Sequence, residues 1–142
     1  AALESGKVAS YVTDFPTEET VGVKGIVAIP HLGASTAESE DNCAVMAALQ
    51  LDDFLRNGNI KNSVNFPNVE LARSGAARIC VLHAAGDDML AAITAAAGSV
   101  AAIASKARGE NAYTIVDVTG DVADAVVAKL AAIEGVYKVR VI

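Results

Sequence analysis

The second half of the chain constrains the fold most strongly, because predicted strands and helices alternate there in a short, regular order. Apolar runs predict strands at 78–84, 100–108, 112–119 and 136–142. We expect a helix capped by Asp87 after the first strand, and a helix that begins at Asp121 before the last one. Gly109-Glu110-Asn111 is typical of a hairpin turn. The order βαββαβ predicts a ferredoxin-like sandwich, with two helices over one face of a sheet.

The predicted strand at 112–119 carries apolar side chains on both of its faces. Tyr113 and Ile115 point to one face, and Val116 and Val118 point to the other. The two helices can cover only one face of the sheet. We therefore expect the other face to meet a partner subunit.

The first half of the chain is organised around two strands that end in polar residues. Ile26 to Ile29 are four consecutive apolar residues and predict a fully buried strand, which Pro30 ends. A predicted strand at 8–15 precedes it, with Asp14 near its carboxyl end. We expect the two strands to deliver Asp14 and His31 to one edge of a sheet, where ligands of open α/β sheets bind.

His31 is the strongest candidate for chemistry, because an imidazole can give and take a proton near neutral pH. Its place between a strand end and a helix start suits a group that transfers protons. A structural histidine, packed under the helix and hydrogen-bonded to the backbone, is the alternative. Asp14 can likewise be only a turn-forming carboxylate, and the residues alone leave both interpretations open.

The longest predicted helix runs from Thr36 to about Arg56. It is expected to start at a capping box, in which the Ser35 hydroxyl accepts a hydrogen bond from the N–H of Glu38. Asn57-Gly58-Asn59 is expected to end it, since these residue types suit a left-handed conformation.

A connector follows the helix at 60–77, and four of its apolar residues are expected to dock on the rest of the chain. These residues are Val64, Phe66, Val69 and Leu71. The hydrophobic pattern pauses at 72–76. We therefore predict two domains, at 1–71 and 76–142.

Charge and cysteine content argue against several classes of partner. The net charge of −6 argues against nucleic acid and anionic membranes, which need a basic surface. No apolar run approaches the ~20 residues that span a bilayer, and the first residues do not form a signal peptide. Cys43 and Cys80 have no metal-ligand spacing, so we expect buried, reduced thiols, no metal site and a cytoplasmic protein.

Several motifs follow one another in a recognisable order. They are Leu3-Glu4-Ser5-Gly6-Lys7-Val8, Asp14-Phe15-Pro16-Thr17-Glu18, Pro30-His31-Leu32-Gly33-Ala34-Ser35-Thr36 and Asn65-Phe66-Pro67. With the βαββαβ unit behind them, these motifs resemble the D-3-phosphoglycerate dehydrogenases of the D-2-hydroxyacid dehydrogenase superfamily. The resemblance covers essentially the whole chain, and the βαββαβ unit is similar to the ACT regulatory domain that ends many of these enzymes. It implies NAD as cofactor, 3-phosphoglycerate as substrate, a role in serine biosynthesis and a homo-oligomer under allosteric regulation.

The resemblance also implies roles for individual residues. His31 corresponds to the catalytic acid/base, which takes the hydroxyl proton as hydride leaves for the nicotinamide. His31, Asp14, Leu32, Gly33 and Ala34 correspond to positions beside the cofactor, with Asp14 near its carboxamide.

Three other parts of such an enzyme have no match in the chain. They are the glutamate paired with the histidine, the arginine that holds the substrate carboxylate and the Gly-rich dinucleotide turn, all of which lie earlier in these enzymes. We therefore expect an α/β chain that is the C-terminal part of one. This chain would contain the remnant of a parallel Rossmann-type sheet and a long helix, followed by the ACT-like domain. We expect the chain to be inactive on its own.

The serine-inhibited relatives carry a His, an Asn and a Pro-Gly pair around the first strand and helix of the ACT domain. Here His83 matches, whereas Ala85 stands at the Asn position and Asp87-Asp88 stand at the Pro-Gly position. These relatives also carry a further Asn from the following strand, for which Ser99 is the nearest candidate in this chain. The resemblance thus implies an amino-acid effector site at His83 and Ser99, with serine bound weakly or replaced by another small molecule. A structural role for His83 remains open.

Two other interpretations stay open beside the dehydrogenase. The chain can be a stand-alone module of ACT type, which binds a small molecule and assembles subunits without catalysis. It can also be a stable fragment from proteolysis of a longer chain.

Overall fold

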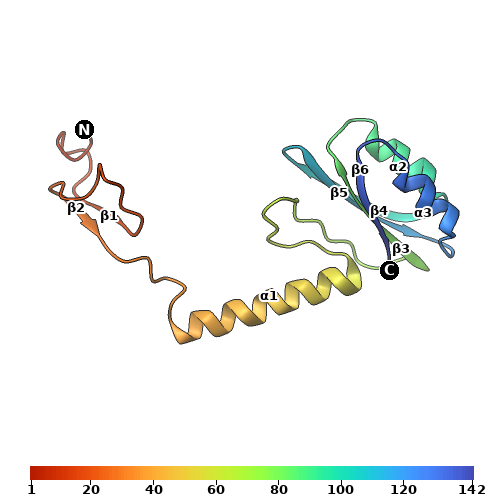
Figure 1. Ribbon diagram of the computed structural model, residues 1–142, viewed down its shortest axis with the longest axis horizontal. Coiled ribbons are helices and arrows are strands. Elements are labelled where there is room, and N and C mark those ends of the chain that lie inside the picture. Colours follow the sequence, from red (N-terminus) through yellow and green to blue (C-terminus); the bar gives the residue numbers. More distant parts are fainter. The chain divides into compact units, whose positions relative to one another are not determined.

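The computed structural model describes residues 1–142 as two compact units, Ala1–Met46 and Ala47–Ile142 (Figure 1). The boundary between the units falls within helix α1 (Ala37–Asn57), between Met46 and Ala47. The expected α/β class is confirmed, since a small parallel sheet lies in the first unit and a four-stranded antiparallel sheet with helices in the second. None of the helices combines the length and the apolar character that crossing a membrane requires.

The first unit contains strands β1 (Tyr11–Thr13) and β2 (Ile26–Ala28), which pair in parallel. The prediction of a fully buried strand at 26–29 is wrong, because Val27 is 52% exposed and Ile29 is 47% exposed. Within this unit β2 has one neighbouring strand and no helix packed against it. Its apolar side chains therefore have too little of the unit around them to be covered.

Thr36, and not Ser35, caps helix α1. The Thr36 Oγ1 atom accepts a hydrogen bond from the Ser39 N–H at 3.2 Å, and the Thr36 hydroxyl lies 2.9 Å from the Ser39 hydroxyl oxygen. The predicted pairing of Ser35 with Glu38 does not form, because the helix begins one residue later than a Ser35 cap requires. As predicted, the helix ends before Gly58, whose φ of 72° is left-handed.

The second unit has six elements in the predicted order. They are β3 (Ala77–Ala84), α2 (Met89–Ala97), β4 (Val100–Arg108), β5 (Asn111–Val118), α3 (Asp124–Ala131) and β6 (Val136–Val141). The strands lie in the order β4-β5-β3-β6, and every neighbouring pair is antiparallel. Helices α2 and α3 lie side by side against this sheet (Figure 1). This arrangement is the predicted βαββαβ sandwich.

Both predicted helix starts in this unit are wrong. Helix α2 begins at Met89 after Asp88, and no side chain caps it, so Asp87 has no capping role. Helix α3 begins three residues beyond Asp121, because Ala123 still has an extended backbone with ψ of 151°.

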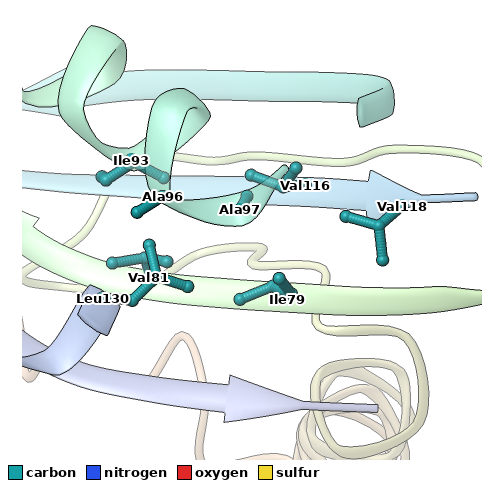
Figure 2. Close-up of a cluster of buried hydrophobic side chains, with 8 residues drawn as sticks. All are labelled: Ile79, Val81, Ile93, Ala96, Ala97, Val116, Val118 and Leu130. Carbon is teal, nitrogen blue, oxygen red and sulfur yellow. The ribbon is translucent and has the colours of Figure 1, made fainter. Parts of the chain in front are cut away.

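The main core lies between the helices and the sheet. Alternate residues of β3 and β5 meet the inner faces of α2 and α3 there (Figure 2). Its buried members are Ile79, Val81, Ile93, Ala96, Ala97, Val116, Val118 and Leu130. This layer accounts for one apolar face of β5.

The other face of the sheet is covered by the connector of the same chain. Tyr113, Ile115 and Cys80 form a second buried cluster with Ile60 and Val69. Phe54, Phe66 and Leu71 pack against it. The expectation that this face meets a partner subunit is therefore wrong, because residues 54–71 fold back over it.

Two smaller expectations about apolar residues are also wrong. Val64 is 86% exposed and does not dock, although Phe66 in the same loop between the paired residues Ile60 and Val69 packs against the second cluster. Cys43 is exposed, because α1 has no buried residue, whereas Cys80 is buried as expected.

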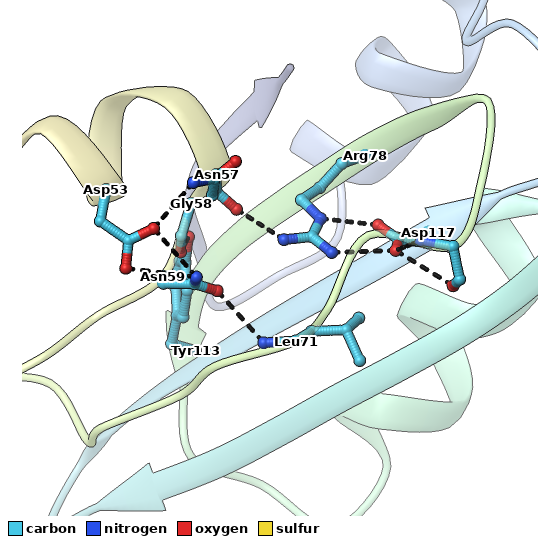
Figure 3. A network of polar contacts seen from close by, with 9 residues as sticks. Asp53, Asn57, Gly58, Asn59, Leu71, Arg78, Tyr113 and Asp117 are labelled. Carbon is cyan, nitrogen blue, oxygen red and sulfur yellow. Dashed lines mark hydrogen bonds and ion pairs between the residues drawn. The ribbon is translucent and has the colours of Figure 1, made fainter.

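The C-terminal end of α1 is held by three side chains of the sheet, which we call the α1 anchor: Arg78, Tyr113 and Arg140. Arg78 Nη1 donates to the carbonyl of Asn57 at 2.7 Å, and the Tyr113 hydroxyl donates to that of Gly58 at 2.6 Å (Figure 3). The Arg140 guanidinium donates to the two carbonyls of Phe54 and Leu55 at 3.4 and 3.2 Å. The last carbonyls of a helix lack partners within it, and here side chains of the sheet donate to them, although the Phe54 carbonyl also accepts from the Gly58 N–H at 3.0 Å.

Candidate active site

Parallel pairing brings the ends of β1 and β2 to one edge of their sheet. Thr13 is paired with Ala28, and the Ile29 N–H donates to the Thr13 carbonyl at 3.0 Å. Asp14 follows directly after β1, and His31 follows shortly after β2. The expectation that the two strands deliver these residues to one edge is confirmed.

Asp14 and His31 form a hydrogen-bonded pair. His31 Nδ1 lies 2.7 Å from Asp14 Oδ2, and the side chains are 53% and 44% exposed. A carboxylate only accepts hydrogen bonds, so the shared hydrogen is carried by Nδ1. Nε2 makes no hydrogen bond within the chain, so in the neutral imidazole its lone pair is free. Within this chain, Asp14 is therefore the hydrogen-bond partner of His31.

Phe15 packs against the imidazole of the same pair. The two ring centroids are 4.3 Å apart and the ring planes are tilted by 44°. The Phe15 N–H donates to Thr13 Oγ1 at 3.1 Å, which bends the chain directly after β1. One short turn thus places both Asp14 and Phe15 against His31.

The loop after His31 has an open surface and a fixed backbone. The Leu32 carbonyl accepts a hydrogen bond from the Ser35 N–H at 3.0 Å, and the Gly33 carbonyl accepts one from the Ser39 hydroxyl at 3.2 Å. Leu32 is 59% exposed, and a Cβ added at Gly33 would have no atom within 4 Å. Ala34 is also exposed. The loop therefore leaves Leu32, Gly33 and Ala34 open to solvent beside His31.

His83 is closed in by its own chain. It is 2% exposed on β3, and its Nδ1 lies 2.8 Å from the Ala84 carbonyl oxygen. Its Nε2 lies 2.8 Å from Thr114 Oγ1, which in turn lies 2.7 Å from the Ser105 hydroxyl oxygen. Both ring nitrogens are therefore used within the second unit.

Ser99 lies at the opposite end of the sheet from His83. The Ser99 carbonyl accepts from the Thr119 N–H, whereas His83 is paired with Ala112. Seven residues of extended chain separate Ala112 from Thr119, which is about 23 Å. The structure does not bring His83 and Ser99 together within one chain. No group of three or more His, Cys, Asp or Glu side chains is placed to hold a metal ion.

Reasoning from sequence missed three polar contacts, two made by these histidines and one made by Thr114 beside His83. The bond between Asp14 and His31 could have been found, since neighbouring parallel strands end at the same edge. The contacts of His83 with Thr114, and of Thr114 with Ser105, depend on the register of β5 against β3 and β4, which no local pattern specifies.

Comparison with known proteins identifies relatives along the whole chain, although no protein-family model matches it. It is 28% identical over 158 aligned positions to D-3-phosphoglycerate dehydrogenase of Escherichia coli K12, covering 99% of this chain and 38% of that enzyme. The enzyme of the same name from Haemophilus influenzae is 29% identical over 157 positions, with the same shares covered. D-3-phosphoglycerate dehydrogenase 2 of Saccharomyces cerevisiae is 38% identical over 55 positions, which are 39% of this chain and 12% of that protein.

The chain thus spans 38% of the length of the bacterial relatives that it matches. The matched stretch is the C-terminal part of those enzymes. Over almost all of its length, this chain is therefore similar to the C-terminal part of enzymes named D-3-phosphoglycerate dehydrogenase.

Proposed function

We propose that the chain is the C-terminal portion of an NAD-dependent D-3-phosphoglycerate dehydrogenase. Such an enzyme oxidises 3-phosphoglycerate to 3-phosphohydroxypyruvate in serine biosynthesis. The observation that carries this proposal is the similarity over 99% of the chain, which includes the strand ends that hold His31 against Asp14. Residues 1–71 belong to the NAD-binding and catalytic region, and residues 76–142 form an ACT-like regulatory domain.

In this function His31 is the acid/base. Its free Nε2 takes the proton of the substrate hydroxyl, and the carbon that carried this hydroxyl becomes a ketone. Asp14 stabilises the imidazolium that results, because its carboxylate lies 2.7 Å from Nδ1. When bound, NAD supplies the hydride acceptor of this oxidation.

The residues around His31 suit one end of that cofactor. Asp14 Oδ1 has no hydrogen-bond partner within the chain, so it is free to accept from the carboxamide of a nicotinamide. Gly33 has open space above its Cα, and the exposed Leu32 and Ala34 flank it. The chain has no GxGxxG turn for the pyrophosphate. It would therefore hold only the nicotinamide end, and the 142-residue chain alone is expected to be inactive.

The test is turnover of the complete protein that contains this stretch, followed by the absorbance of NADH. His31→Gln is expected to lower kcat by about 10²–10⁴-fold, because it removes general acid/base catalysis. Glu19→Gln changes an exposed side chain of the same unit, outside the matching motifs, and should leave kcat unchanged. A His31→Gln protein that turns over like the parent would contradict the proposal.

Regulation by a small amino-acid effector is the second part of the proposal. The ferredoxin-like unit supports it, whereas the enclosed His83 and the distant Ser99 do not form a ready site in one chain. Serine and other amino acids are expected to raise the melting temperature of the second unit if they bind. A rise in melting temperature without any dehydrogenase activity of the complete protein would favour the stand-alone ACT-type module.

A further inference from the structure

We propose that Ser39 is a positioning residue, which holds the loop after His31 in one conformation by donating a hydrogen bond to the Gly33 carbonyl. This inference rests on the proposed function, in which that loop lies beside the nicotinamide. It goes beyond that function, because it assigns a task to a residue of helix α1 that lies outside the matching motifs.

The first observation is that few contacts hold this loop. Residues 31–38 are all exposed, and a Cβ added at Gly33 would have no atom within 4 Å. One backbone hydrogen bond lies within the loop, from the Ser35 N–H to the Leu32 carbonyl at 3.0 Å. The conformation of the loop therefore depends on its hydrogen bonds more than on packing.

The second observation is the hydrogen bond that ties the loop to the helix. The Ser39 hydroxyl donates to the Gly33 carbonyl at 3.2 Å, and the two residues are six positions apart in the chain. Ser39 is half-buried, whereas its neighbours Glu38 and Glu40 are exposed. The Ser39 side chain therefore lies against the loop instead of extending into solvent.

The third observation is that Thr36 completes this contact. A carbonyl only accepts hydrogen bonds, so the Ser39 hydroxyl gives its hydrogen to Gly33. The Ser39 oxygen then accepts from the Thr36 hydroxyl at 2.9 Å, and Thr36 Oγ1 accepts from the Ser39 N–H at 3.2 Å. Successive hydrogen bonds of this kind strengthen one another. The cap of α1 and the bond to the loop therefore form one network.

The position of Ser39 in the helix explains how it reaches the loop. Thr36 is the N-cap, so Ser39 is the third residue of the helix after it. In a capping box this position carries a Glu or Gln, whose side chain reaches back to the N–H of the cap. Here the side chain meets the Gly33 carbonyl instead, three residues before the cap. The first turn of the helix thereby fixes the loop that precedes it.

The expected consequence concerns binding more than chemistry. In the proposed enzyme this loop presents Leu32, Gly33 and Ala34 to the cofactor. A loop that is already ordered loses little conformational freedom when a ligand binds, whereas a looser loop must be ordered first. Loss of the Ser39 hydroxyl should therefore weaken the binding of NAD and leave proton transfer at His31 unchanged.

The test in the complete protein measures kcat and the KM for NAD of Ser39→Ala. We expect KM to rise about 2–10-fold, as for the loss of one hydrogen bond, and kcat to stay within about twofold. Ser39→Thr keeps a hydroxyl and should restore KM. Asn42→Ala is the matched control, because Asn42 is an exposed residue of the same helix whose side chain makes no hydrogen bond.

A second measurement needs neither NAD nor 3-phosphoglycerate and uses NMR of the 142-residue chain. The carbonyl ¹³C signal of Gly33 should move upfield in Ser39→Ala, because the oxygen loses its hydrogen bond. The Ser35 amide should exchange its hydrogen about 2–10-fold faster, since the loop opens more readily. Ser39→Thr and Asn42→Ala should keep both values of the parent chain.

An unchanged Gly33 carbonyl signal in Ser39→Ala would overturn the inference. So would an unchanged KM, a KM that Ser39→Thr does not restore, or a fall of kcat at constant KM, which would mean that less of the protein is folded. If the complete protein has no dehydrogenase activity, the proposed function fails. The Gly33 signal and the Ser35 exchange rate then still decide whether Ser39 holds the loop.

Discussion

Arg78 and Asp117 face each other from β3 and β5 and are each only 1% exposed. Arg78 Nε and Nη2 donate to the two carboxylate oxygens at 2.6 and 2.9 Å (Figure 3). The Ser74 N–H and hydroxyl donate to Asp117 Oδ2. Such a buried pair adds little over an apolar one, but removing one partner leaves an unpaired charge.

Asp117→Asn is therefore expected to lower the free energy of unfolding by about 3–5 kcal/mol, as measured by urea denaturation. Asp52→Asn is the matched control. It breaks the pair of Asp52 with Arg56, whose side chains are 57% and 75% exposed, and should leave the free energy of unfolding nearly unchanged. Equal losses in the two variants would contradict this assignment.

The same carboxylate gives the stability a defined dependence on pH. Burial alone would raise the pKa of Asp117, but hydrogen bonds from Arg78 and Ser74 lower it below its ordinary value. A folded-state pKa below the unfolded one means that the stabilisation is complete above the unfolded pKa and is lost as the pH falls through the folded pKa. The stability difference between the parent and Asp117→Asn should therefore be constant near neutral pH. It should shrink below about pH 4, as measured by denaturation at several pH values.

Single residues were predictable where a local rule sufficed. The positions of Asp14 and His31 follow from strand ends, and Gly58 ends α1 as expected. The cap of α1 was predicted at Ser35 but lies at Thr36, since two adjacent hydroxyl residues both satisfy the local pattern. The pair of Arg78 with Asp117 was not foreseen, because it links residues far apart in the sequence.

At the scale of elements, the α1 anchor joins the helix to the sheet. The pKa of Tyr113 is raised, chiefly by burial, so its hydroxyl stays a donor to the Gly58 carbonyl at any ordinary pH. The Arg140 guanidinium also lies 4.5 Å above the Phe54 ring. The helix has no buried residue of its own, so its position depends on this end.

Gly58→Ala tests how tightly the anchor is packed. A Cβ at this position would overlap the Cys80 sulfur, and φ is +72°. We expect a loss of about 1–2 kcal/mol from the left-handed backbone and about 1–3 kcal/mol more from the overlap. Gly109→Ala is the control. Gly109 has φ of +60°, but an added Cβ would have no atom within 4 Å, so we expect only the loss from the left-handed backbone. Thermal unfolding of the two variants measures the difference. Equal losses of stability would mean that the Cys80 side chain can move to make room for the added Cβ.

Most elements were predictable because their periodicity is strong. The βαββαβ order and the long helix agree with the structure to within a few residues. The helix starts near Asp87 and Asp121 were misplaced, since any acidic residue before an apolar run resembles a cap. The covering of Tyr113 and Ile115 by residues 54–71 was missed, because irregular connectors have no period from which docking can be read.

At the scale of the whole molecule, the two units differ in how well they are covered. The second unit has apolar clusters on both faces of its sheet, whereas β1 and β2 form an isolated pair. A two-stranded sheet is only marginally stable in water. The family resemblance was predictable from the motifs, but the exposure of Val27 and Ile29 was not, because an apolar run does not specify its neighbours.

Hydrogen exchange should separate the two units. The amides of Tyr11 and Ile29, which bond across the first unit, are expected to exchange with little protection. The amides of Val81 and Ile115, at the centre of the second sheet, should exchange only on global unfolding. Similar protection at all four amides would show that the first unit is more stable than its two strands suggest.

Helix α1 continues without a break through the boundary at Met46 and Ala47, and only its carboxyl end is bound by the anchor. Free helices melt from both ends, but here the final turn cannot come apart without also breaking contacts to three strands. Fraying should consequently run in one direction, from Ala37 toward Asn57. Shortening the helix from its amino end would then erode it turn by turn, with the remaining turns still seated on the sheet.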